Sequence, residues 1–295
     1  MNEHLDQLLT SVPDAAETIS SLKALQEATK GIPFPLIVEP PVFVLAESDQ
    51  PPTMHTLTQD LVVAWMAHMS FGCRVRMEAL ERSIFSELAN GSFYVPVVLI
   101  RSHLEIAGCA AYTNKVLMKF SETQDYASLG REILRTAYSS AVAKHDPTVI
   151  KTRVMPGVFA EPRSVMNMID ALQSFFDIAV GSSVYDLRAQ YACLCDFAHP
   201  AIRGTSSFVT LGGERGGGWE RQYSSKESVE PSAIKALLTM LLWSMRCGYS
   251  NAAFIHCGRL IGEADGFRYD KPSLQSCKDI WTVFMQCESS EGKAQ

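Results

Sequence analysis

The chain has 295 residues, 47% of them hydrophobic, and a formal net charge of −6. This composition is typical of a globular protein with one large domain or two ordinary ones. The negative charge gives no general attraction to a phosphate backbone, so nonspecific nucleic-acid binding is disfavoured. The longest apolar runs fall short of the ~20 residues that a membrane span needs. Glu3 and Asp6 stand where a signal peptide would be basic, so we expect a cytoplasmic protein.

The N-terminal part divides from the rest by composition. Residues 1–30 have helical apolar spacing interrupted by Pro13, which predicts a kinked helix or helical hairpin. Residues 31–54 hold six of the 14 prolines and predict an extended linker. We expect one helical-bundle domain over 55–288 and a disordered tail at 289–295.

Helical spacing recurs through the main body. It predicts one long helix over 57–88, ended by Asn90-Gly91, and a segment over Val95–Phe120 that is apolar on nearly every side and therefore central. Further helices are predicted at 126–144, 161–179, 182–199, 230–248, 250–262 and 272–287. The glycine-rich stretch 205–224 predicts a hairpin or flap and lacks the Gly-Lys-Ser/Thr ending of a phosphate loop. The predicted fold class is mainly α, a helical bundle with a small β-hairpin insertion.

Two charges interrupt the most apolar segment. Arg101 and Glu105 lie one helical turn apart, and charged side chains are almost never fully buried unless they are paired. If they are buried, removing one partner should cost ~3–5 kcal/mol, so their presence needs a structural or functional reason. The alternative is a simple intrahelical ion pair on an exposed strip.

The stretch 183–203 predicts a helix that opens at Ser182 or Ser183 and stops at Pro200. Asp196 and His199 are one turn apart on one face with Cys195, so the carboxylate can hold the imidazole. The alternative is that His199 only caps the helix, its imidazole bonding the last free carbonyls.

Metal and thiol chemistry are weaker candidates. Asp196-x-x-His199 matches one arm of a di-iron bundle site, but none of the other six histidines has an acidic residue three positions before it. On a helix Cys193 points away from Cys195 and His199, which disfavours zinc. Cys195 adjoins Leu194 and Phe197 rather than a polar cleft. The eight cysteines form no CxxC pair, so we expect reduced core thiols, no metal and no cofactor.

The remaining candidate chemistry is phosphoryl transfer. Cleavage of RNA by its own 2′-hydroxyl needs a group that moves a proton near neutral pH and a cation that stabilises the phosphorane. His199 would be the acid or base and Arg101 the phosphate clamp, while Glu105 and Asp196 would orient them.

The motifs resemble those of an uncharacterised subgroup of bacterial all-helical proteins near the HEPN superfamily. The resemblance covers roughly residues 57–203 and rests on Arg-x-x-x-Glu and Tyr-x-x-Leu-x-Asp-x-x-His-Pro, which are Arg101, Glu105, Tyr191, Leu194, Asp196, His199 and Pro200. It implies a helical bundle, often a homodimer, from a toxin–antitoxin or antiviral defence system. Many such proteins are metal-independent ribonucleases, and others are inactive nucleotide-binding or scaffold modules.

The sequence departs from the active members at one point. They carry an arginine four to six residues before the histidine, and here the nearest preceding arginine, Arg188, is too far from His199. Either Arg101 or Arg203 replaces it in space, with Tyr191 beside the substrate, or the site is degenerate. The expected function is therefore a HEPN-like ribonuclease acting on RNA, or a non-catalytic scaffold that binds a nucleotide or a protein partner such as an antitoxin.

Overall fold

The structure is a computed structural model of the whole chain, and it describes the residues that follow: 3–12, 15–16, 19–20, 59–123, 125, 128–129, 132, 135–136, 163–180, 186–199, 209–215, 218–223 and 231–263. Its helices are α1 (Glu3–Thr10), α4 (Gln59–Ala89), α5 (Tyr94–Thr123), α9 (Val165–Val180), α10 (Leu187–Ala198) and α12 (Pro231–Glu263). Its strands are β1 (Val209–Arg215) and β2 (Gly218–Tyr223).

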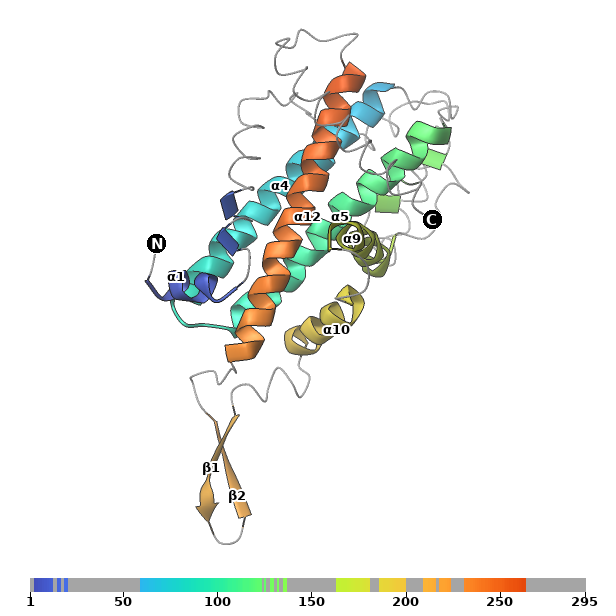
Figure 1. The fold of residues 1–295 in the computed structure, drawn as a ribbon. Helices are drawn as coiled ribbons and strands as arrows, with labels where there is room; N and C mark the ends of the chain where they lie inside the picture. Colours follow the sequence, from blue (N-terminus) through green and yellow to red (C-terminus); the bar gives the residue numbers. More distant parts are fainter. Residues whose placement is uncertain are drawn as a thin grey trace, which may run out of the picture.

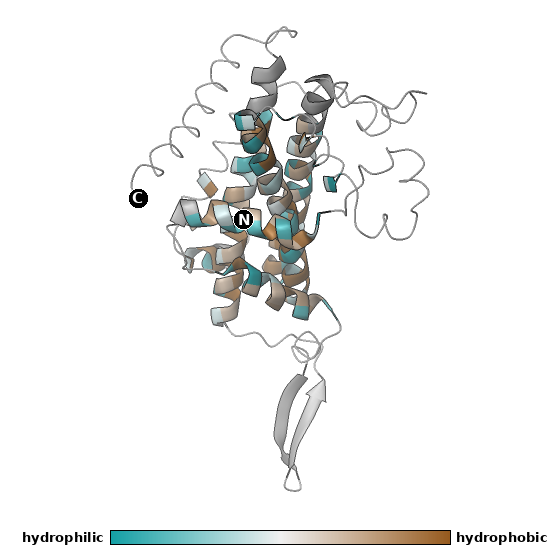
Figure 2. Ribbon diagram, turned by 90° about the vertical axis from the view of Figure 1, so that its right-hand side faces the viewer, coloured by the Kyte–Doolittle hydropathy of each residue, from teal (hydrophilic) through white to brown (hydrophobic). Residues whose placement is uncertain are grey.

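Three long helices, α4, α5 and α12, pack side by side and form the body of the molecule (Figure 1). α5 contacts α4, α9, α10 and α12, which confirms the central place predicted for the segment that is apolar on nearly every side. α9, seen almost end-on in Figure 1, lies across the long helices in Figure 2. The fully buried core side chains come mainly from the long helices and include Met77, Ile84, Ile100, Leu104, Leu238 and Leu241. The protein is mainly α, as the sequence predicts.

The helix boundaries follow local chemistry. α4 ends where predicted, because Gly91 has a φ of 75° and continues the chain in the left-handed region that glycine adopts without strain. α5 begins at Tyr94, with Pro96 in its first turn, where the missing N–H costs no hydrogen bond. Ser164 Oγ accepts the N–H of Asn167, and Asn167 Oδ1 accepts the N–H of Ser164, so α9 begins with a reciprocal cap.

Two predicted boundaries are wrong. α10 begins at Leu187 rather than behind Ser182 or Ser183, because the Asp186 carboxylate accepts the N–H of Ala189 and caps the helix there. α12 is one continuous helix, whereas the sequence suggested separate helices at 230–248 and 250–262. The helix continues through Gly248. A Cβ at this position would lie 2.6 Å from Met77 Sδ and 3.0 Å from Ala107 Cβ. This glycine lets α12 approach α4 and α5 closely.

Between α10 and α12 the strands β1 and β2 pair antiparallel, with Val209 opposite Tyr223 and a register shift between Leu211 and Glu214. Most of the N-terminal segment, the proline-rich linker 31–54, most of 126–144, the helix expected at 272–287 and the tail 289–295 lie outside the described residues. The domain boundaries expected from the sequence therefore stay predictions.

By length and composition, one stretch in the described part of the chain could cross a membrane, Tyr94–Phe120 in α5. Half of its most apolar window is buried inside the bundle, as expected for the core helix of a helical domain.

Candidate functional site

The two charges of α5 meet α10 in a compact polar group, the Arg101 cluster, made of Arg101, Glu105, Tyr191 and Cys195. Arg101 Nη2 lies 2.9 Å from Glu105 Oε1 and donates to the Tyr191 hydroxyl at 3.1 Å. Its Nε donates to Cys195 Sγ at 3.2 Å. The Tyr191 hydroxyl in turn donates to Glu105 Oε1 at 2.5 Å. Each member is therefore bonded to at least one other across or along the helices.

The cluster lies at the edge of the bundle. The Arg101 and Glu105 side chains are 26% and 28% exposed, so the pair lies between the two alternatives, full burial and an exposed strip. The Arg101 guanidinium also lies 5.4 Å from the centroid of the Tyr191 ring, within cation–π range. Burial, and then the hydrogen bond to the Glu105 carboxylate, raises the pKa of Tyr191. The phenol consequently stays protonated and acts as a donor.

Helical geometry explains why these four residues meet. Arg101 and Glu105 share a face of α5, and Tyr191 and Cys195 share a face of α10, because residues four apart are neighbours on a helix. Arg101 bonds to both α10 residues, while Glu105 bonds to the earlier one, so the two pairs interlock. The i, i+4 spacing that drew attention to Arg101 and Glu105 also brings the partner residues together.

The other predicted site residues lie farther along α10 or outside the described chain. Asp196 and His199 are both exposed on its last turn. His199 is the C-cap, and its backbone N–H donates to Cys195 O at 2.9 Å. His199 follows Cys195 by four residues and thus extends the stripe that faces Arg101, while Asp196 lies about 100° around the helix from Cys195. Arg203 is outside the described residues.

An apolar hollow of about 190 Å³ lies on another face of α10. It is formed by the beginnings of α5 and α12 together with α10, and neither Arg101 nor Glu105 lines it. Its wall from α10 is made of Gln190, Cys193, Leu194 and Phe197. Cys193 and Cys195 therefore line different environments, as their positions on a helix predict.

A second polar group, absent from the sequence predictions, is buried between α4, α5 and α12. We call Glu81, His103, Ser244 and Tyr249 the core tetrad. His103 Nδ1 lies 2.8 Å from Ser244 Oγ and its Nε2 lies 2.9 Å from Glu81 Oε1. The Tyr249 hydroxyl donates to Glu81 Oε2 at 3.0 Å. The tetrad joins all three long helices.

The serine–histidine–carboxylate order of the core tetrad matches that of a nucleophilic relay, but its burial decides its role. The exposure of His103 is 0%, that of Ser244 3% and that of Glu81 7%, so a substrate cannot reach the hydroxyl. In the core, polar groups must be hydrogen-bonded to one another, and these are. The core tetrad is therefore a structural network in this conformation.

The tetrad could not be found from spacing, because its partners are 22, 141 and 168 residues apart along the chain. Only His103 is conspicuous in the sequence, because a histidine between Arg101 and Glu105 in the most apolar segment is a candidate for a buried polar residue. The helical spacing of 183–203 predicts that Cys195 shares a face with Asp196 and His199, but it does not predict that the thiol accepts a hydrogen bond from Arg101.

Metal binding finds no further support in the part of the chain that the structure describes. No three His, Cys, Asp or Glu side chains there gather closely enough to hold a metal ion. The described cysteines, Cys73, Cys109, Cys193, Cys195 and Cys247, are free thiols.

Comparison of the chain with known proteins gave no match among protein-family models, curated proteins or solved structures.

Proposed function

We propose that this protein is a non-catalytic helical scaffold of the HEPN-like kind, which acts by binding a nucleotide or a protein partner. The observation that supports this proposal is that Arg101 is hydrogen-bonded to side chains of the protein itself. Its Nε and Nη2 donate to three side chains of the protein, and Glu105 balances its charge. A phosphate clamp needs a cation whose donors point at the place where charge develops. In the Arg101 cluster the Nε and Nη2 donors are directed at the protein's own side chains.

The cluster has a clear structural use. It fixes α10 on the face of α5, and Gln173 of α9 supports the same helix by accepting the Leu187 N–H at 2.7 Å. α10 is short, and a short helix depends on tertiary contacts for its stability. The Arg101 cluster thus fixes the position of α10. A fixed α10 suits a scaffold, because it can present a constant binding surface to a partner.

A second candidate is the metal-independent ribonuclease, and one observation favours it. His199 is exposed and follows Cys195 by one turn, so its imidazole has access to solvent beside the cluster. In this version His199 transfers the proton, Asp196 orients it, and Arg101 or Arg203 contacts the phosphate beside Tyr191. Arg101 would first have to exchange Glu105 for the phosphate.

The two versions are separated by incubating the purified protein with RNA in EDTA. We expect no cleavage above that of the His199→Ala variant. Because His199 is exposed, its replacement should leave the fold intact, and His68→Ala, at an exposed histidine of α4, is the matched control. Cleavage that persists in His68→Ala and disappears in His199→Ala would overturn the scaffold proposal in favour of the ribonuclease.

The proposal also includes expectations about the location, the oligomeric state, the partner and the 205–224 segment. They are a cytoplasmic homodimer from a defence or toxin–antitoxin system, an antitoxin or other defence component as partner, and a β-hairpin insertion over 205–224. Size-exclusion chromatography with light scattering tests the dimer, for which a monomer at micromolar concentration would be the contrary result.

A further inference from the structure

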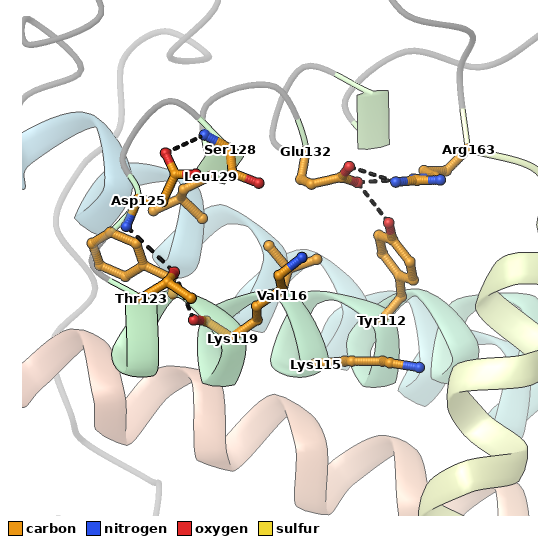
Figure 3. A pocket seen from close by; sticks show the side chains of 11 residues that line it. Tyr112, Lys115, Val116, Lys119, Thr123, Asp125, Ser128, Leu129, Glu132 and Arg163 are labelled. Atoms are coloured by element: carbon orange, nitrogen blue, oxygen red, sulfur yellow. Dashed lines mark hydrogen bonds and ion pairs between the residues drawn. The ribbon is translucent and has the colours of Figure 1, made fainter.

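A second hollow lies along the C-terminal half of α5, away from the Arg101 cluster. Figure 3 looks into this space of about 190 Å³, which lies between α5 below and Asp125, Ser128, Leu129, Glu132 and Arg163 above. We call it the α5 hollow. The apolar part of its lining is Val116, Phe120 and Leu129. Lys115 is ten residues beyond Glu105, about 15 Å along the helix axis.

One end of the hollow is closed by a carboxylate that is already satisfied. Arg163 donates to both oxygens of Glu132, and the Tyr112 hydroxyl donates to its Oε2 at 2.6 Å (Figure 3). Arg135 Nη1 also donates to its Oε1, at 3.2 Å. Burial alone would raise the pKa of Glu132, but the hydrogen bonds from Arg163 and Tyr112 lower it. The carboxylate is ionised, and its charge is balanced by two arginines.

At the opposite end, Thr123, Asp125 and Ser128 are linked by hydrogen bonds. The Asp125 carboxylate accepts the Ser128 N–H at 3.0 Å, and Thr123 Oγ1 accepts the Asp125 N–H at 3.4 Å (Figure 3). Thr123 Oγ1 also donates to Lys119 O at 2.9 Å. The polar groups at this end already have hydrogen-bond partners within the protein, so we do not assign the head group of a ligand to it.

Two lysines of α5 remain. Lys115 and Lys119 are exposed, line the hollow and lie one turn apart. Within the described residues, neither is in an ion pair with a carboxylate. The hydrogen bond from Arg188 is the main cause that lowers the pKa of Asp170, and the nearby charge of Lys115 acts in the same direction. Among the described residues, three cationic side chains line the hollow against two carboxylates, an excess of one positive charge in a chain of net charge −6.

We propose that the α5 hollow binds a small amphipathic anion. Its apolar body would lie on Val116, Phe120 and Leu129, and its anionic head, a carboxylate or a phosphate, would contact Lys119 and Lys115. At about 30 Å³ for each water, the hollow has room for on the order of six waters, which suits a single ring or a short chain. Drug-sized ligands occupy larger sites, of roughly 300–1,000 Å³.

This inference uses none of the residues that carry the scaffold proposal, so either can fail alone. The RNA assay depends on His199 and the Arg101 cluster, whereas anion binding depends on lysines at the other half of α5.

The test is isothermal titration of the full chain, at low ionic strength, with phenyl phosphate and with octanoate. We expect one of them to bind, and Lys119→Gln to weaken that binding about fivefold, because one cation near an exposed anionic head contributes up to about 1 kcal/mol. Lys235→Gln, at an exposed lysine of α12 outside the hollow, should leave the affinity unchanged. The tighter probe shows which combination, a ring with a phosphate or an alkyl chain with a carboxylate, fits the hollow better.

Any of three results would overturn the proposal. The first is the absence of binding by both probes at millimolar concentration. The second is equal affinity in Lys119→Gln and the parent protein. The third is equal affinity for the uncharged analogues benzyl alcohol and octanol. Because the substituted lysines are exposed, circular dichroism should show unchanged helicity, and loss of binding cannot then be attributed to unfolding.

Discussion

The Arg101 cluster and the core tetrad both take residues from one short stretch of α5, but they lie in different environments. Arg101 and Glu105 are about a quarter exposed at the edge against α10, whereas His103 between them is fully buried against α4 and α12. Two residues along a helix correspond to a rotation of about 200°, so neighbouring polar residues point to opposite sides. Breaking a hydrogen bond should therefore change the free energy of unfolding by different amounts in the two networks.

The difference teaches how burial sets the cost of an imperfect network. In the core, each polar group left without its partner keeps the full penalty of having lost water. At the edge, water can replace a lost partner, and surface ion pairs contribute little. Mutations in the two groups should therefore differ in size although the bonds have similar lengths.

The largest effect is expected in the centre. Glu81→Leu or His103→Leu should each lower the free energy of unfolding by ~3–5 kcal/mol, because each leaves a buried polar partner uncompensated. The double variant should lose less than the sum, since it removes both members of the pair. Urea unfolding followed by circular dichroism measures all three. Additive losses would show that the two side chains are not coupled.

The next effect concerns the packing around α5. Gly108→Ala places a Cβ 2.8 Å from the backbone oxygen of Met168 in α9, so the helices must separate, and we expect a loss of ~1–3 kcal/mol. Gly72→Ala in α4 is the matched control. A Cβ there meets nothing within 4 Å, so the better helix propensity of alanine should add ~0.5–1 kcal/mol. Thermal unfolding of both variants should show shifts of opposite sign.

A matched pair of tyrosines compares the two networks directly. Tyr249→Phe leaves a carboxylate oxygen of Glu81 without its donor in the core and should cost ~1–3 kcal/mol. Tyr191→Phe removes the equivalent bond to Glu105, whose side chain is 28% exposed and can bond to water instead, and should cost ~0.5–1.5 kcal/mol. Both changes delete one hydroxyl, so the volume change is the same. A larger loss in Tyr191→Phe would contradict the argument from burial.

The smallest effect is the salt dependence of the edge. Arg101→Gln should cost about 1 kcal/mol at low ionic strength and less at 1 M salt, where the Debye length is about 3 Å. The loss caused by Glu81→Leu should hardly change over the same range, because buried pairs are screened much less. Chemical denaturation in urea at two salt concentrations gives both numbers. Equal salt dependence would place the two networks in similar environments.

Local signals in the sequence predicted several elements closely. The apolar spacing and the Asn90-Gly91 pair gave the extent of α4, and an apolar surface on nearly every side gave the central position of α5. The predicted break near residue 249 was wrong, because a glycine in a helix can mark either an end or a close approach. Only the position of Met77 and Ala107 opposite Gly248 shows which one applies.

The candidate site divides in the same way. The sequence by itself determined the helical class and the pairing of Arg101 with Glu105, because both follow from periodicity along one helix. The tertiary structure alone decided that Tyr191 and Cys195 complete this pair, that His103 meets Glu81 and Ser244, and that Lys115 and Lys119 border a hollow. These contacts join residues far apart in the chain, and helix packing fixes them through side-chain shape, which no single helical pattern contains.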